Sequence, residues 1–132
     1  MPRSAELLGI AHTLGQHAQG WQYFSAFRAL NLRCDATNLR MYHLNLLTET
    51  CSPHELFAST DSLSAASWLR RELEELLSLR GFALSDLTEA AIEISVLPGG
   101  DGSMFGVRVQ LARHGRVFSR ALDPAGRTLK EL

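Results

Sequence analysis

The stretch FGVRVQLARHGRVFSRAL, residues 105–122, decides the fold of this chain. Its first half alternates apolar residues with small or polar ones, which is the period-two pattern of a β-strand with one buried face. His114-Gly115 then interrupts the pattern in the manner of a tight turn, and a second apolar-rich segment follows over residues 117–122. The stretch therefore predicts an antiparallel hairpin.

Strand character extends outward from this hairpin in both directions. Residues 90–97 alternate in the same way and reach the hairpin through the flexible turn Pro98-Gly99-Gly100-Asp101-Gly102. After the tight turn at residues 123–126, residues 127–132 are predicted to form a last short strand. The tail thus reads as an antiparallel meander of three or four strands, and residues 39–47 add strand character earlier in the chain.

Two long segments have the period of helices instead. The first begins near Ser4, a suitable N-cap, and the second runs from Asp61 or Ser62 to Gly81, which occupies the position of a left-handed C-terminal residue. Each carries apolar residues at spacings of three and four. The first stripe contains Leu7, Ile10, Ala11, Leu14, Ala18, Trp21 and Phe24, and the second contains Leu63, Ala66, Leu69, Leu73, Leu76 and Leu77.

These elements predict one α+β domain over residues 1–132. We expect the two main helices to pack on one face of an antiparallel sheet formed mostly by the C-terminal half. A length of 132 residues suits one domain, and 45% apolar with 20% charged residues is ordinary for a globular protein. Disordered, collagen-like and disulfide-scaffold classes are excluded by this composition.

Charge and cysteine content give little direct indication of function. Thirteen basic residues face fourteen acidic ones, so the net charge of -1 creates no global attraction to polyanions. No apolar run approaches the length of a membrane span, and the first residues lack the pattern of a secretory signal. With only two cysteines, we expect reduced thiols and a cytoplasmic location.

The hairpin has two possible registers with different consequences. A two-residue turn at His114-Gly115 pairs Leu111 with Phe118 and places Phe118 on the core face, whereas a three-residue turn pairs Leu111 with Val117. The second register would put Arg108, Arg116, Phe118 and Arg120 on one outward face, which would suit single-stranded nucleic acid. The first register buries more apolar surface, and we favour it.

Apolar residues outside the two helical stripes are candidates for a protein interface. They are Tyr23, Phe27, Leu30, Trp68 and Leu79. One small sheet cannot cover two faces of every helix, so these side chains lie either in the core or against a partner. The leading hypothesis is a small non-enzymatic binding or adaptor protein that uses them for protein–protein contacts or homodimerisation, and nucleic-acid binding by the hairpin is the alternative.

No group of residues has a spacing specific enough to name a reaction or a cofactor. Cys34, His43, Cys51 and His54 lie within one stretch, but a gap of eight residues between Cys34 and His43 is unlike the closely paired ligands of zinc sites. A catalytic or small-molecule site around His43, Cys51 and His54 is a third hypothesis. No metal and no cofactor is predicted.

Overall fold

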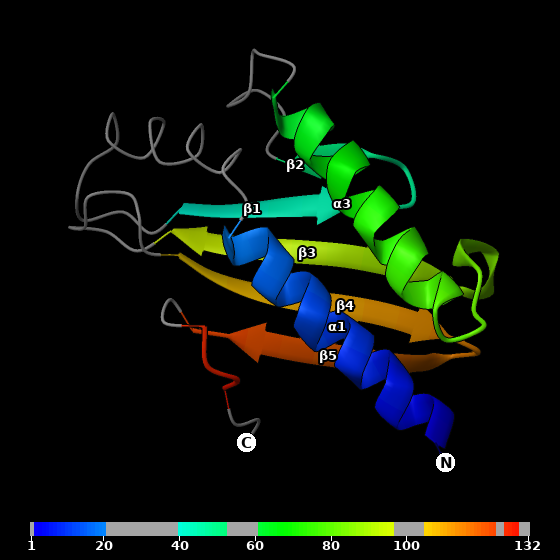
Figure 1. Cartoon of the computed structure of the whole chain (residues 1–132). Helices are drawn as coiled ribbons and strands as arrows, with labels where there is room; N and C mark the ends of the chain where they lie inside the picture. The colour runs from blue at the N-terminus through cyan, green and yellow to red at the C-terminus, as the bar shows by residue number, and fades with distance from the viewer. Residues whose placement is uncertain (1, 21–39, 53–60, 97–104, 124–125, 130–132) are drawn as a thin grey trace.

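The computed structural model describes residues 2–20, 40–52, 61–96, 105–123 and 126–129. Within these ranges, two α-helices lie on one face of a five-stranded antiparallel sheet (Figure 1). The helices are α1 (Pro2–Gly20) and α3 (Asp61–Ser78), and a 3-10 turn, η3 (Leu84–Asp86), follows α3. The strands are β1 (Arg40–Asn45), β2 (Thr50–Ser52), β3 (Glu89–Val96), β4 (Phe105–Arg113) and β5 (Arg116–Leu122). The α+β prediction is confirmed.

The sheet has the strand order β2-β1-β3-β4-β5, with every neighbouring pair antiparallel. The three strands β3, β4 and β5 come from the C-terminal half, as the alternating pattern predicts. The short strand β2 is an addition that the sequence did not reveal. The strand expected over residues 127–132 is reduced, within its described part, to an isolated bridge between Leu122 and Thr128.

The hairpin of β4 and β5 adopts the register with the two-residue turn. Arg113 pairs with Arg116 and Leu111 pairs with Phe118. His114 and Gly115 both have positive φ, at 52° and 76°, which is the signature of a type I′ turn. This turn has the twist of the two strands that it joins, so it favours the register that sends Phe118 into the core.

Helix α1 covers β4 and β5 through its apolar stripe (Figure 1). Leu7, Ala11, Leu14 and Ala18 are all almost completely buried. Gly15 lets the helix come close to the sheet, because a Cβ built there would lie 2.6 Å from Leu122 Cδ1. Real Cβ atoms do not approach other atoms this closely, so a side chain at position 15 would push the helix or Leu122 away.

Helix α3 ends as its sequence predicts, and its end positions an aromatic ring. Gly81 has a φ of 78°, and the N–H of Phe82 donates to the carbonyl of Leu77 over 2.9 Å, as in a Schellman cap. In this cap the residue after the glycine packs back against the helix. Phe82 is accordingly buried in the core, with 6% of its surface exposed.

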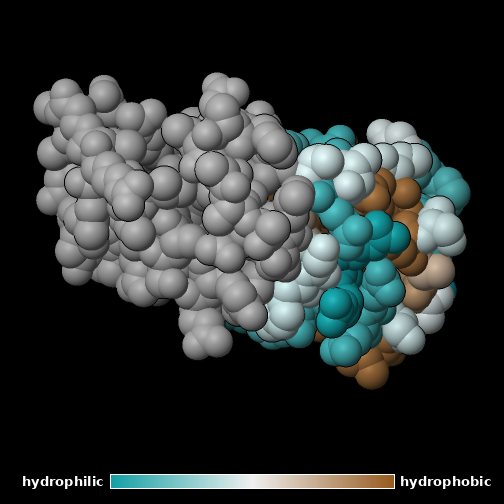
Figure 2. All heavy atoms as spheres, turned by 90° about the horizontal axis from the view of Figure 1, so that it is seen from above, coloured by the Kyte–Doolittle hydropathy of each residue, from teal (hydrophilic) through white to brown (hydrophobic). Residues whose placement is uncertain are grey.

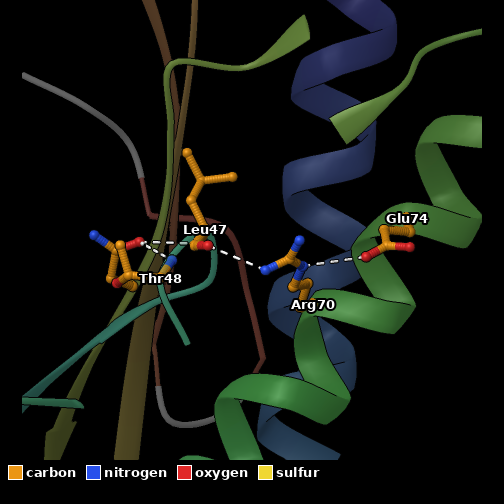
Figure 3. Close-up of polar contacts among 5 residues, drawn as sticks. Leu47, Thr48, Arg70 and Glu74 are labelled. Atoms are coloured by element: carbon orange, nitrogen blue, oxygen red, sulfur yellow. Dashed lines mark hydrogen bonds and ion pairs between the residues drawn. The ribbon is translucent and has the colours of Figure 1, made fainter. Parts of the chain in front are cut away.

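One arginine ties the turn between β1 and β2 to α3 (Figure 3). Arg70 donates from Nη1 to the carbonyl oxygen of Leu47 over 3.1 Å and from Nε to Glu74 Oε1 over 3.2 Å. The side chain of Asn45 accepts hydrogen bonds from the N–H groups of Leu47 and Thr48, which closes the turn. The edge of the sheet at β2 is thus held against the helix by polar contacts.

The second face of the sheet is polar. Glu89, Glu93, Arg108 and Gln110 lie on it, and Gln110 Nε2 donates to Glu89 Oε1 over 2.7 Å. Seen from above, the described part of the surface is also chiefly hydrophilic, with smaller hydrophobic areas (Figure 2). Neither of the helices in the described ranges has the length and apolar character needed to cross a bilayer.

Gly15→Ala and Gly9→Ala should change stability in opposite directions. Alanine raises helix propensity by about 1 kcal/mol at both positions. At Gly15 the added methyl group must displace Leu122 Cδ1, and overpacking costs about 1–3 kcal/mol, so we expect a net loss of roughly 1 kcal/mol. At Gly9 a Cβ meets no atom within 4 Å, so we expect a gain of about 0.5–1 kcal/mol. Urea unfolding of dilute protein measures both, and equal gains in the two variants would contradict the close approach at Gly15.

Candidate functional site

Two of the five predicted interface residues lie in the described part of the chain, Trp68 on α3 and Leu79 just after it. Trp68 is half-buried and packs against the core. Leu79 follows the last turn of α3 and is 75% exposed, more than the other large apolar side chains that are exposed in the described ranges, Val117 and Leu129. Tyr23, Phe27 and Leu30 lie outside the described residues. Leu79 is therefore the one of the five that the structure places in solvent.

Leu79 lies at the edge of an apolar groove between the two helices. The groove has a volume of about 370 Å³. Ala5, Gly9 and Ile10 of α1 line one side of it, and Leu76 and Leu79 line the other. Because a Cβ at Gly9 would meet no atom within 4 Å, the groove is open at this position. A highly exposed leucine thus lies beside an open groove.

Charged groups of opposite sign flank the apolar part of the groove. Glu6 of α1 and Arg80, just beyond α3, both line it. Glu6 also lies near Arg3, with 3.7 Å between its Oε2 and Arg3 Nη1. Further along the two helices, His17 Nδ1 of α1 lies 3.2 Å from Glu72 Oε2 of α3, and both side chains are partly exposed. The groove therefore offers apolar contact together with one cationic and one anionic group.

The four residues of the predicted nucleic-acid face are not brought together on an open face. Arg108 is exposed on the polar face of the sheet, with Nη1 3.4 Å from Ser119 Oγ. Phe118, only 7% exposed, points to the other face and belongs to the core. Arg116 and Arg120 lie on the same, helix-covered side of β5 as Phe118, opposite to the side of Arg108. The two-residue turn causes this separation, because it fixes the register in which Phe118 lies opposite Leu111.

The cysteine and histidine residues considered for chemistry are mostly not described. Cys34 and His54 lie outside the described residues, and His43 is exposed on β1. Cys51 lies on β2, where its backbone pairs with Leu44. Within the described part of the chain, no group of three or more His, Cys, Asp or Glu side chains could hold a metal ion.

Sequence reasoning missed the groove and a cluster of arginines near it. In the sequence, Gly9 is a glycine within a helical pattern and Arg80 is one charge near the end of another. Their proximity depends on how α1 and α3 pack together, and no local periodicity reports that. The one available signal was the position of Leu79 outside the apolar stripe of its helix.

Comparison with known proteins identifies no relative of this chain. No protein family, no curated protein and no solved structure matches it. The function must therefore be argued from the geometry.

Phe118→Ala tests whether this ring belongs to the core. Removing a buried phenylalanine side chain typically costs about 3–5 kcal/mol, so we expect a loss of that size in the free energy of unfolding. Val117→Ala, at a neighbouring position that is 57% exposed, is the matched control and should cost less than about 1 kcal/mol. Chemical denaturation compares the two. A small loss for Phe118→Ala would mean that the ring faces solvent.

Proposed function

We propose that this chain is a small non-enzymatic binding protein that acts through protein–protein contacts, and that its partner is a second copy of itself. The observation that supports this is the position of Leu79, exposed by 75% at the edge of the apolar groove between α1 and α3. An exposed large apolar side chain beside an apolar hollow is typical of an interaction surface. A cytoplasmic adaptor role is part of the same proposal.

A second copy fits because the protrusion and the hollow occur on the same surface. In a dimer with twofold symmetry, the same patch contacts itself, so residue i of one copy meets residue j of the other and the reverse. Leu79 of each copy would then enter the groove at Gly9 of the other. Burying a leucine side chain contributes about 1.5–3 kcal/mol, and the symmetry supplies that contact twice.

The charges at the groove are compatible with this arrangement. Across a twofold axis, Glu6 of one copy can approach Arg80 of the other, and the reverse pair forms at the same time. A patch carrying one charge of each sign has no net repulsion against its own copy. The contact rests on one leucine and one pair of charges from each copy, so we expect a weak dimer with a Kd of roughly micromolar order.

Leu79→Glu should abolish self-association. A carboxylate in place of the leucine would have to lose its hydration against the apolar residues near Gly9, which costs more than the contact gains. Sedimentation velocity over a concentration series should show a monomer–dimer equilibrium for the unmodified chain and a monomer for Leu79→Glu. The matched control is Leu129→Glu, at a leucine that is 45% exposed and does not line the groove, and it should dimerise like the unmodified chain.

Two results would contradict the proposal. The unmodified chain could remain monomeric up to millimolar concentration, in which case a second copy is not the partner. Leu79→Glu and Leu129→Glu could instead weaken association equally. Added negative charge in general would then weaken association, and docking of Leu79 in the groove would not be its basis.

A further inference from the structure

A basic pocket lies at the end of the molecule where three elements meet. The start of α1, the segment after α3 and the turn between β4 and β5 come together there (Figure 1). The pocket has a volume of about 610 Å³, within the range of small-molecule sites. Arg3, Arg80, Arg113 and Arg116 all line it.

The pocket concentrates positive charge in a chain whose net charge is -1. Against its four guanidinium groups, Glu6 is the one carboxylate among the described lining residues, and it lies within 4 Å of Arg3. Arg80, Arg113 and Arg116 have no carboxylate partner among the described residues. Like charges in one pocket repel one another, and a bound anion would reduce this repulsion.

One aromatic ring of the core contacts two of these arginines. The ring of Phe82 has the guanidinium carbon of Arg3 4.2 Å from its centroid and that of Arg113 5.2 Å from it. Phe82 is itself fixed by the cap at Gly81. Arg113 has a further unusual feature, because its Nε is buried and has no hydrogen-bond partner in the described part of the chain. A buried donor without an acceptor is rare in proteins and calls for an explanation.

The hairpin of β4 and β5 also contributes an arginine and an aromatic ring to the pocket. Arg116 lies over the ring of Phe118, with its guanidinium carbon 5.7 Å from the centroid. Cation–π contacts restrict the orientation of a guanidinium group, so less conformational freedom is lost when a ligand binds. The first turn of α1 contains no acidic residue, and its positive end adds to the potential at Arg3 and Ser4.

We propose that this pocket binds a compact anion with at least two negative charges, either a phosphorylated or a polycarboxylate small molecule. Guanidinium groups bind both classes through paired, parallel N–H donors. The ligand would sit between Arg80, Arg113 and Arg116, the three cations without a carboxylate partner in the described ranges. The pocket adjoins the groove at Leu79, because Glu6 and Arg80 line both, but anion binding does not require self-association.

The binding can be measured with pyrophosphate and citrate as probes of the two classes. Each is titrated into ¹⁵N-labelled protein at constant ionic strength, with acetate as a monovalent control. We expect saturable shifts of the amide signals of residues 80 and 113–116 with pyrophosphate, citrate or both, and the tighter of the two identifies the class. Acetate should produce no saturable change.

Charge-neutralising variants test whether the arginines make the site. Arg116→Gln, at an exposed position, should weaken binding about tenfold or more, since a charged hydrogen-bonding partner is lost, and Arg113→Gln should do the same. The matched control is Arg71→Gln on the exposed side of α3, which removes the same charge away from the pocket and should leave the Kd unchanged.

The proposal is overturned if neither pyrophosphate nor citrate shifts these signals at tens of millimolar, or if acetate shifts them equally. It is also overturned if Arg71→Gln weakens binding as much as Arg116→Gln, because only diffuse charge would then be involved. Repeating the titration on Leu79→Ser separates the two proposals, because this change removes the apolar contact without adding a charge beside Arg80, and the anion site should persist when self-association is weakened.

Discussion

The two-residue turn at His114-Gly115 is the constraint on which the rest of the structure depends. Its positive φ angles join β4 and β5 with the twist that adjacent strands require. Because side chains alternate along a strand, a shift of one residue would move every side chain of β5 to the opposite face. The turn therefore determines that Phe118 and Leu122, and not Val117, complete the core beneath α1.

The same register positions the arginine pocket. It sends Arg113 and Arg116 to the helix-covered side, where they lie near the start of α1 and the end of α3. Close packing of α1 on the sheet at Gly15 brings Arg3 to the same place, and the cap at Gly81 places Phe82 between two arginines. The core and the charged pocket are thus consequences of one set of strand and cap geometries.

Much of this fold follows from local patterns in the sequence. The helical stripes, the C-terminal glycine of α3 and the hairpin register could be predicted, because each depends on periodicity or on turn chemistry. The three-residue strand β2 is too short to show a period. The groove and the pocket combine residues as distant as Arg3 and Arg113, whose proximity arises from packing alone. Gly15 illustrates the limit. In the sequence, a glycine inside a helix only lowers helix propensity. The structure shows that it lets α1 approach Leu122 closely.

Nuclear Overhauser effects between β4 and β5 test the register most directly. The account predicts backbone cross-strand contacts between Ala112 and Val117 and between Gln110 and Ser119, with the ring protons of Phe118 close to the methyl groups of Leu111. Contacts that instead place Leu111 opposite Val117 would contradict it. Phe118 would then face outward, and the core beneath α1 as well as the arginine pocket would lose their basis.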